Sequence, residues 1–456
     1  DTLGIWTHNN LSFLVALIAA ARVGLISILI NPIYEKKELS FCLKKTQLKG
    51  LVIGERYGTR NYYGTLSQLI PDLNKMKPGQ IKSQEFPNLS TVITCEKEAF
   101  VTFVLWNDNE MLSFIFAVTG DPKAALDSHL GVVNNTYFIG KRNMLHERHQ
   151  NVPLFHALGS IVTSLSALRH GASLVLASPT YNVTANLNAL LAEKCTVITG
   201  TPTMYVDLLS EIKTKGSLPF NVEVALAAAA PCSPQLIRSI NGLLNAKSAL
   251  YGLSETTASV FQSVDGDSVD LVAETVGYIQ DHQEAKVVDE NRNTLPFGSP
   301  GELVVRGYNN MICYWDEPAK TKQIMQEDGW LHTGDKFIIS EDGYGRIVGR
   351  LKDIIIKGGE NIAPKEIEDL LNTHPDIIES QVVGVPDERL GEELCAVLRI
   401  KESATVNLDV IKSHCSGHLA RFKIPRILKI TSEFPKTASG KIQKFRIKEM
   451  IEAGKL

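Results

Sequence analysis

The chain has 456 residues, of which 44% are hydrophobic and 21% are charged, so it has the composition of a globular protein with room for two or more domains. A formal net charge of −3 provides no basic surface of the kind that neutralises phosphate backbones, which disfavours nucleic acid as a partner. The seven cysteines are scattered without a CxxC pair, a distribution that is typical of reduced thiols and argues against a disulfide framework or a zinc site.

The most apolar stretch of the chain, residues 11–30, raises the question of a membrane span. Arg22 and Gly24 interrupt it, so we predict a buried helix that ends near Arg22, a turn at Gly24, and a buried parallel strand over residues 25–30. No membrane span is expected. The first ten residues contain no basic or Arg-rich leader, and no targeting peptide is expected in this chain.

Further apolar runs alternate with helix-like segments and turn residues, a pattern that predicts repeated β-α units around a mostly parallel, covered sheet. These runs are residues 50–53, 172–177 and 196–200. From about residue 259 to residue 307 the chain changes to short strands with close-set Gly, Pro and Asp. This change predicts a smaller β-rich subdomain.

After Gly349 the pattern becomes compact, with a helix predicted over residues 364–373, strands over 380–385 and 393–400, and a helical tail. The predicted fold class is therefore α/β. It consists of a large N-terminal body of stacked β-α sheets with a small β-rich subdomain, followed by a small, mobile α+β C-terminal lid domain.

The string Tyr251-Gly252-Leu253-Ser254-Glu255-Thr256 follows a predicted strand and places a hydroxyl next to a carboxylate. The hydroxyl can bind a phosphate oxygen, and the carboxylate can hold Mg²⁺, which prefers oxygen ligands. In isolation, a string of this length is more often a plain turn.

Two further strings carry groups suited to a nucleotide and to a hinge. Asp335 follows a Gly turn after a strand, where a carboxylate can accept two hydrogen bonds from a ribose diol, although a surface turn is the simpler account. Residues 349–362 join the charges of Arg350 and Lys352 to an apolar strand and the pair Gly358-Gly359. These charges lie at the predicted domain boundary. A hinge there must remain solvated in more than one conformation, and charged side chains suit that requirement.

A lysine and a histidine complete the set of candidate residues. Lys441 lies in a small flexible loop, PKTASGKIQK, and can supply a mobile charge that stabilises carboxylate and phosphate oxygens during adenylation. The alternative is a solvated basic tail. His156 lies in the apolar segment PLFHALG, where a single histidine is usually a packed core residue.

Taken together, these five strings have the order and spacing of the acyl-CoA synthetase/luciferase superfamily of adenylate-forming enzymes. The chain most resembles the mitochondrial medium-chain acyl-CoA ligases of that superfamily, over nearly its whole length. The other segments that carry the resemblance are NPIYEKKELSFCLKK, GTPTMYVDLL, PGELVVRGYNNMICYWDEPAKT, VGRLKDIIIKGGENIAPKEIEDLL, VVGVPDERLGEELCAVLRIK and FKIPRILKITSEFPKTASGKIQKFRIKE.

The resemblance implies a role for each candidate residue. The implied catalytic residues are Lys441 for adenylation, Glu255 as the Mg²⁺ ligand, and His156 as a gate beside the acyl and CoA pocket. The implied nucleotide-binding residues are Thr119, Gly120, Lys123, Tyr251, Gly252, Ser254, Asp335 as ribose clamp and Arg350. Lys352 resembles the hinge, and Gly358 and Gly359 would line the pantetheine tunnel of CoA, where absent side chains allow close approach.

The resemblance also implies the reaction and the organisation of the chain. A fatty acid and ATP with Mg²⁺ would form an acyl-adenylate, the lid would rotate, and CoA would then displace AMP. Residues 1–350 would be an AMP-binding domain that lacks its start, and residues 351–456 the AMP-binding lid. The compartment implied by the resemblance is the mitochondrial matrix.

The phosphate loop departs from the pattern of the superfamily, which reads roughly Thr-Ser-Gly-Thr-Thr-Gly-x-Pro-Lys-Gly. The corresponding residues here are Ile115-Phe116-Ala117-Val118-Thr119-Gly120-Asp121-Pro122-Lys123-Ala124. Phe116 and Val118 cannot provide the hydroxyl donors or the glycine geometry that such a loop uses to enclose an anion, and Asp121 adds negative charge. Each lost charge-assisted hydrogen bond is worth about 1.5–3 kcal/mol, so the first half-reaction is the step most at risk.

Other departures lie elsewhere in the first half of the chain. Residues 224–231 replace glycines of the superfamily with Ala, and two spans, between Cys95 and Phe114 and between His146 and Pro153, look short. These departures favour an alternative, a non-catalytic relative that binds acyl-CoA, AMP or a protein partner. An amino-acid-activating domain of a peptide synthetase is disfavoured because no carrier domain follows Leu456.

Overall fold

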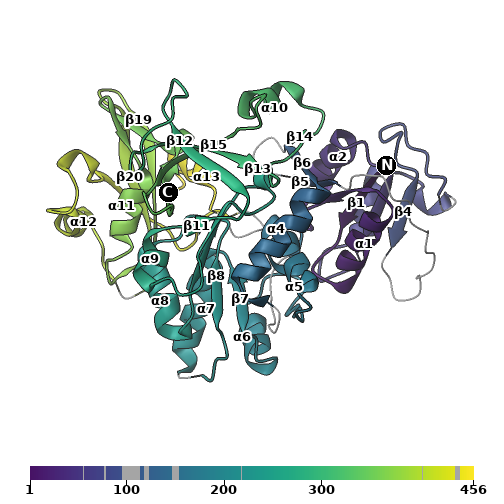
Figure 1. The fold of residues 1–456 in the computed structure, drawn as a ribbon, viewed down its shortest axis with the longest axis horizontal. Helices are drawn as coiled ribbons and strands as arrows, with labels where there is room; N and C mark the ends of the chain where they lie inside the picture. The colour runs from purple at the N-terminus through teal and green to yellow at the C-terminus, as the bar shows by residue number, and fades with distance from the viewer. Residues whose placement is uncertain are drawn as a thin grey trace. The chain divides into compact units, whose positions relative to one another are not determined.

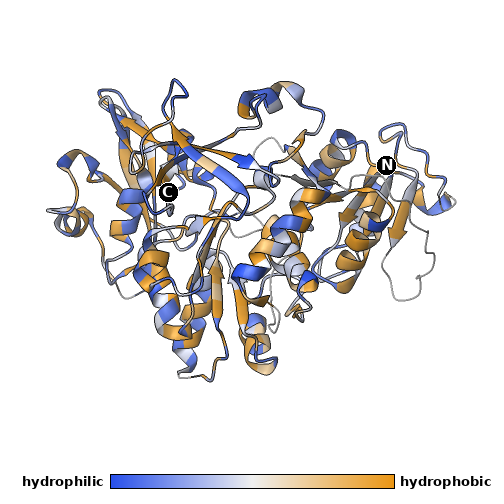
Figure 2. Ribbon diagram, in the orientation of Figure 1, coloured by the Kyte–Doolittle hydropathy of each residue, from blue (hydrophilic) through white to orange (hydrophobic). Residues whose placement is uncertain are grey.

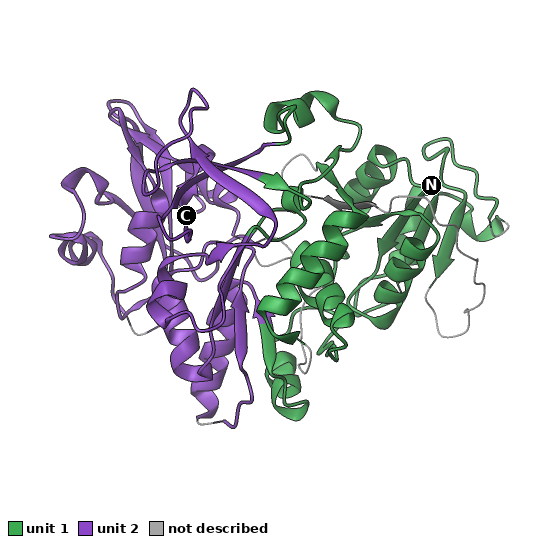
Figure 3. Cartoon of the chain, in the orientation of Figure 1, with its two compact units in different colours: residues 1–198, 252–260, 306–329 green, residues 199–251, 261–305, 330–456 purple. Residues whose placement is uncertain are grey.

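The computed structural model describes residues 1–456 except residues 55, 77–78, 95–112, 118–122, 146–153, 217, 403 and 437–441, and for residues 113–117 only the backbone. The described chain divides into two compact units (Figure 3). Unit 1 comprises residues 1–198, 252–260 and 306–329, and unit 2 comprises residues 199–251, 261–305 and 330–456. Both units draw residues from the predicted body, so the predicted division at residue 350 stays a prediction.

Unit 1 contains a sheet with the strand order β14-β6-β5-β2-β1-β3-β4 (Figure 1). The strands from β5 to β4 in this order are parallel to their neighbours, and β6 and β14 are added antiparallel at one edge. Their bounds are β1 Thr2–Trp6, β2 Ile26–Leu29, β3 Gly50–Ile53, β4 Thr91–Thr94, β5 Ser113–Ala117, β6 Ala124–Ser128 and β14 Cys313–Tyr314.

Side-chain caps begin several helices of unit 1. Asn10 accepts a hydrogen bond from the Phe13 N–H, and Ser128 accepts one from the Gly131 N–H, so each satisfies an N–H group that the first turn leaves unpaired. The helices are α1 Leu11–Arg22, α2 Lys36–Lys45, α3 Tyr62–Leu69, η1 Leu73–Lys75, α4 His129–Arg142, the π-helix η3 Leu158–Leu165, α5 Ser166–Arg169, α6 Val183–Ala192, η4 Ser254–Thr256 and α10 Pro318–Ile324.

The prediction for residues 11–30 is confirmed, because α1 ends at Arg22, Gly24 has a φ of 69° and β2 follows directly. No helix in the described ranges combines the length and the apolar character that crossing a bilayer requires. The strand predicted over residues 172–177 is wrong: these residues form only an isolated bridge at Leu174. An apolar run becomes a strand only where a neighbouring strand pairs with it, and propensity alone does not provide that partner.

Two further sheets lie largely in unit 2, with the orders β11-β10-β9-β8-β7 and β12-β13-β15-β16. Residues 197–198 of β7 and residues 306–307 of β13 belong to unit 1. The strands are β7 Val197–Gly200, β8 Val224–Ala227, β9 Ser248–Tyr251, β10 Phe261–Gln262, β11 Tyr278–Ile279, β12 Gln283–Val288, β13 Gly301–Gly307, β15 Leu331–Ile339 and β16 Gly345–Arg350. The helices are α7 Pro202–Lys215, α8 Pro234–Leu244 and α9 Val269–Glu274. Hydrophobic residues dominate β7 and β8 (Figure 2), as expected for strands that are buried on both faces.

The last part of unit 2 is the predicted lid, which has its own sheet with the order β18-β17-β20-β19 and β21 paired to β20. The strands are β17 Ile355–Lys357, β18 Glu360–Ile362, β19 Ile377–Asp387, β20 Gly391–Ile400 and β21 Ile427–Ile430. The helices are η5 Leu351–Asp353, α11 Pro364–Leu371, α12 Leu408–Cys415, η6 Arg421–Lys423 and α13 Lys444–Glu452. The predicted helices and strands of this region are confirmed.

Alternation along β19 and β20 explains why helices cover both faces of the lid sheet. Val382 and Leu394 belong to a core cluster shared with α11 and α12, whereas their neighbours Val383 and Cys395 belong to a second cluster that includes Ile447 of α13. Successive side chains of a strand point to opposite faces, so an apolar strand of this kind requires cover on each side. The predicted α/β fold class is confirmed.

Candidate functional site

The predicted ribose clamp lies in a buried polar cluster of unit 2. Asp335 in β15 is only 3% exposed, and its Oδ2 accepts a hydrogen bond of 2.7 Å from the Tyr251 hydroxyl at the end of β9. Its Oδ1 is 3.0 Å from Arg350 Nε, and these two residues are direct partners in the pairing of β15 with β16. The structure therefore brings together three of the predicted nucleotide-binding residues.

The surroundings of Tyr251 keep its hydroxyl available as a hydrogen-bond donor to the Asp335 carboxylate. Burial raises the pKa of Tyr251 well above its ordinary value, and the neighbouring negative charge of Asp335 raises it further, so the hydroxyl keeps its proton. A protonated phenol donates to one carboxylate oxygen while Arg350 pairs with the other. A carboxylate has about four lone-pair sites, so further donors such as a ribose diol can be accepted.

Gly252 follows Tyr251 directly, at the point where the chain passes from unit 2 to unit 1. A Cβ atom on Gly252 would lie 2.0 Å from the Ala258 carbonyl oxygen, so no other residue fits without moving the backbone. This close approach closes a turn that begins with the 3₁₀-helix η4 and carries the partly buried Ser254 and Glu255. The requirement for glycine at this position therefore has a packing cause.

The predicted Mg²⁺ ligand, Glu255, is held by a residue that the sequence did not indicate. The Tyr314 hydroxyl donates to Glu255 Oε1 at 2.6 Å, and Lys123 Nζ lies 5.0 Å from the centre of the Tyr314 ring. Lys123 is one of the predicted phosphate-binding residues. Within unit 1, Tyr314 therefore contacts both a predicted phosphate-binding residue and the predicted metal ligand.

Asp127 of β6 is fully buried, and the sequence did not indicate it either. Burial raises the pKa of this carboxyl well above its ordinary value, and the charge of Glu255 raises it further. Both effects favour the neutral form of this carboxyl beside Glu255. Its only signal in the sequence is a single acidic residue in an apolar strand.

The predicted gating residue, His156, lies just before the π-helix η3. Its Nδ1 accepts a hydrogen bond of 3.2 Å from the Leu158 N–H, which fixes the ring against the start of the helix. The wide turns of η3 are stabilised by hydroxyl groups that donate to carbonyl oxygens five residues earlier, as Thr163 does to Leu158 and Ser164 does to Gly159. Helices of this type are frequent at functional sites.

The predicted CoA-contacting pair lies in the turn between β17 and β18. Gly358 and Gly359 have φ values of 60° and 89°, a region that side-chain-bearing residues rarely adopt. The preceding Lys357 is buried and forms a close ion pair with Glu393, and its Nζ donates to the Phe422 carbonyl at 3.1 Å. The turn therefore projects from an anchored strand.

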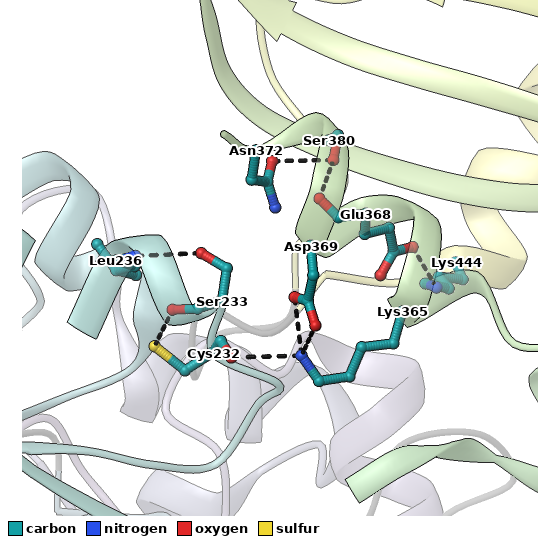
Figure 4. Close-up of polar contacts among 9 residues, drawn as sticks. All are labelled: Cys232, Ser233, Leu236, Lys365, Glu368, Asp369, Asn372, Ser380 and Lys444. Carbon is teal, nitrogen blue, oxygen red and sulfur yellow. Dashed lines mark hydrogen bonds and ion pairs between the residues drawn. The ribbon is translucent and has the colours of Figure 1, made fainter. Parts of the chain in front are cut away.

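Helix α11 connects the lid to the segment that follows β8 within unit 2 (Figure 4). Lys365 Nζ donates to both carboxylate oxygens of Asp369, at 2.8 and 2.7 Å, and to the Cys232 carbonyl at 3.4 Å. Inside the lid, Lys444 Nζ is 2.6 Å from Glu368 Oε1, so α13 is also tied to α11.

Three of the predicted site residues, Thr119, Gly120 and Lys441, lie outside the described residues, as do residues 118–122 of the phosphate loop. Lys436 and Ile442, on either side of the Lys441 loop, pair as an isolated bridge. The two spans that look short in the sequence also lie largely outside the described part of the chain.

The donor set suits Mg²⁺ better than a transition metal. No group of three or more His, Cys, Asp or Glu positioned to hold a metal is present in the described ranges. Mg²⁺ is commonly held by one or two carboxylates together with substrate phosphates, so the Glu255 carboxylate fits a metal that arrives with ATP.

Comparisons with protein families agree with this geometry. Residues 1–315 match the family model for AMP-binding enzymes, and residues 366–441 match that for the AMP-binding enzyme C-terminal domain. The medium-chain acyl-CoA ligase ACSF2, mitochondrial, of Bos taurus is 38% identical over 486 aligned positions, which cover 99% of this chain and 79% of that protein. The putative acyl-CoA synthetase YngI of Bacillus subtilis is 33% identical and covers 98% of this chain and 87% of its own length.

Solved structures share the fold. ATP-bound MatB from Rhodopseudomonas palustris superposes with a TM-score of 0.83 at 26% identity, covering 99% of this chain and 89% of that one. The anthranilate CoA ligase AuaEII in complex with anthranoyl-AMP reaches a TM-score of 0.86 at 21% identity, covers 100% of this chain and 88% of that one, and supports the fold alone. The comparisons confirm the predicted resemblance and the predicted enzyme class, and the chain belongs to the AMP-binding enzyme family.

Proposed function

We propose that this chain is an ATP-dependent, AMP-forming ligase that activates a medium-chain fatty acid as an acyl-adenylate and transfers it to CoA. We further propose that its altered phosphate loop slows the first of these half-reactions. The assignment of a medium-chain acid draws on the ACSF2 relatives, which are medium-chain acyl-CoA ligases by name. The mitochondrial location proposed for the chain draws on the same names.

One observation carries the proposal, the Asp335 carboxylate held between the Tyr251 hydroxyl and Arg350. Burying a carboxylate to 3% exposure is unfavourable unless donors surround it, and this arrangement provides one neutral and one positively charged donor. In our proposal the Asp335 carboxylate also accepts the two ribose hydroxyls of the nucleotide, and Arg350 contacts the nucleotide beside it.

The remaining roles follow the residues of unit 1 and the lid. Glu255 would hold Mg²⁺ on the phosphates, Ser254 would contact a phosphate oxygen, and Lys441 would stabilise the charge that develops as the carboxylate attacks ATP. Magnesium bound there would neutralise phosphate charge and orient the leaving pyrophosphate. His156 would border the acyl and CoA pocket.

The backbone of β5 supports the view that the phosphate loop is altered at its start. Residues 113–117 pair with β6, and residues 114–116 also pair with β2, so the first loop positions, residues 115–117, continue a strand. The aligned length of 486 positions also exceeds the 456 residues of the chain, so the chain lacks residues that the bovine relative has within the aligned span.

The two half-reactions can be measured separately. Purified protein is incubated with octanoate, ATP and Mg²⁺, and the release of pyrophosphate is followed; in parallel, synthetic octanoyl-adenylate and CoA are supplied, and octanoyl-CoA is followed. We expect slow pyrophosphate release and faster thioester formation. Lys441→Ala is expected to abolish the first activity and to retain the second, since its charge acts on the adenylation step.

A second candidate function is binding without catalysis, which the replacement of loop residues by Phe116 and Val118 favours. In that case the protein would bind AMP or acyl-CoA with measurable affinity but would produce neither pyrophosphate nor thioester in the two assays. If neither pyrophosphate nor thioester is produced while AMP binding is retained, the ligase proposal is overturned and binding without catalysis is supported.

A further inference from the structure

Glu255 is fixed by a segment that is distant in the sequence. The Tyr314 hydroxyl donates to Glu255 Oε1 at 2.6 Å, and the Met311 N–H donates to the Glu255 carbonyl oxygen at 2.9 Å. One short segment therefore holds both the side chain and the backbone of the proposed metal ligand. The Tyr314 contact orients the carboxylate, and the Met311 contact fixes the backbone that carries it.

Tyr314 is itself held rigidly. It is 4% exposed, it pairs with Ala125 across the edge of the unit 1 sheet, and its N–H donates to Thr321 Oγ1 at 2.9 Å. The ammonium group of Lys123 lies over its ring at 5.0 Å, and the attraction of a cation to the ring face adds a further restraint. The phenol is therefore oriented before any ligand arrives.

The turn after Glu255 is strained, which explains why it needs such support. Thr257 and Ala258 have φ values of 49° and 81°, a conformation that is costly for any residue with a Cβ and more so for a β-branched one. Asn135 Nδ2 donates to the Thr257 carbonyl at 2.6 Å, and the Thr257 hydroxyl donates to the Asn309 carbonyl at 2.6 Å.

The side chain of Asn309 stabilises the same turn by contacts before and after Thr257 and Ala258. Its Nδ2 donates to the carbonyl oxygens of Thr256, at 3.3 Å, and Ser259, at 3.4 Å, and both Asn309 and Asn135 are fully buried. A strained backbone persists only where its surroundings over-determine it. The segment that carries Tyr314 thus also helps to maintain the shape of the turn on which Glu255 lies.

We propose that Tyr314 is a positioning residue for the Glu255 carboxylate, and through it for Mg²⁺, an inference that rests on the proposed function. The phenol occupies one lone-pair site of the carboxylate and so directs the remaining sites toward the metal that arrives with ATP. A carboxylate that is already oriented loses less conformational freedom when the metal binds.

The test compares two Tyr→Phe variants. Tyr314→Phe removes the hydrogen bond to Glu255, and Tyr344→Phe removes a hydrogen bond of similar length, 2.7 Å, to Asp267 Oδ1 in unit 2. Binding of an ATP analogue with a methylene bridge between its α and β phosphorus atoms is titrated by calorimetry at increasing Mg²⁺. We expect the half-maximal Mg²⁺ concentration to rise about tenfold in Tyr314→Phe and to stay unchanged in Tyr344→Phe.

Metal-free AMP binding separates positioning from general damage. AMP affinity should be unchanged in Tyr314→Phe. In a Glu255→Gln background, Tyr314→Phe should no longer change the Mg²⁺ requirement, because the contact between the phenol and the carboxylate is already lost. An unchanged or lowered Mg²⁺ requirement in Tyr314→Phe overturns the inference about Tyr314 and leaves the proposed function standing. If the unmodified protein binds AMP but its binding of the analogue is independent of Mg²⁺, both the proposed metal site and the inference fail.

Discussion

Tyr251 and Asp335 lie 84 positions apart in the chain, yet the Tyr251 hydroxyl donates to Asp335 Oδ2 at 2.7 Å. Tyr251 ends a strand of one sheet of unit 2, and Asp335 belongs to a strand of another. This hydrogen bond is therefore one of the links between the two sheets, and it lies at the residue that is proposed to hold the ribose. Removing either partner should affect both the binding of nucleotide and the packing between these sheets.

Asp335→Asn is expected to weaken AMP binding by about 10- to 100-fold, which corresponds to the roughly 1.5–3 kcal/mol of hydrogen bonds to a charged acceptor. Calorimetric titration with AMP measures the change. Asp270→Asn is the matched control, because Asp270 also pairs with an arginine, Arg238, at 3.0 Å but is 78% exposed. If both variants lose affinity equally, Asp335 has no specific role in nucleotide binding.

Local patterns in the sequence predicted much of this molecule. The interruption at Arg22 and Gly24 located the end of α1, and the apolar runs after Gly349 located the lid strands, because both signals depend on neighbouring residues. The contact of Tyr314 with Glu255 joins residues 59 positions apart, and no local pattern contains it. Such pairings depend on strand order, which composition and periodicity do not determine.

Ala229→Gly is expected to stabilise the protein. Ala229 has a φ of 70°, where a residue with a Cβ costs about 1–2 kcal/mol, while the added backbone freedom of glycine in the unfolded chain offsets about 0.5–1 kcal/mol. The net gain should be about 0.5–1 kcal/mol in thermal or urea unfolding. The neighbouring Ala227→Gly, in the buried strand β8, should destabilise instead, and the same sign for both variants would contradict the argument.

Lys357→Met is expected to destabilise the protein by about 3–5 kcal/mol, because it leaves the carboxylate of Glu393 buried without its main partner. The two side chains are only 4% and 6% exposed. The double variant Lys357→Met/Glu393→Leu should recover most of the loss, since neither charge is then buried. Urea unfolding of both variants provides the measurement.

The control for this prediction is Lys412→Met, which breaks a pair with Asp409 whose side chains are 55% and 91% exposed. It should change stability by less than about 0.5 kcal/mol. A single variant of Lys357 that is as stable as the unmodified chain would show that water reaches the Glu393 carboxylate.

Two aspartates should give opposite dependence of stability on pH. Burial raises the pKa of Asp369 although Lys365 donates to it, so its contribution is present below the unfolded-state pKa and is lost as pH rises through the folded-state value. Hydrogen bonds from Asn293 and Asn291 lower the pKa of Asp289, so its contribution is present above the unfolded-state pKa and is lost as pH falls.

The unfolding midpoints of Asp369→Asn and Asp289→Asn, measured from about pH 2 to about pH 8, test these signs. Relative to the unmodified chain, Asp369→Asn should gain stability as pH rises, and Asp289→Asn should lose it. Parallel curves for the two variants would mean that neither carboxyl has the environment that the structure gives it.

Restoring the phosphate loop should raise the rate of the first half-reaction alone. The triple variant Phe116→Ser/Ala117→Gly/Val118→Thr returns two hydroxyl donors and one glycine to positions where the superfamily has them. Each recovered hydrogen bond to a phosphate oxygen is worth about 1.5–3 kcal/mol, so the ATP concentration for half-maximal pyrophosphate release should fall by at least about tenfold. Thioester formation from synthetic octanoyl-adenylate and CoA should keep its rate, because that step binds no ATP and releases no pyrophosphate. A gain in both activities would point instead to improved folding, and a gain in neither would show that the loop does not limit adenylation.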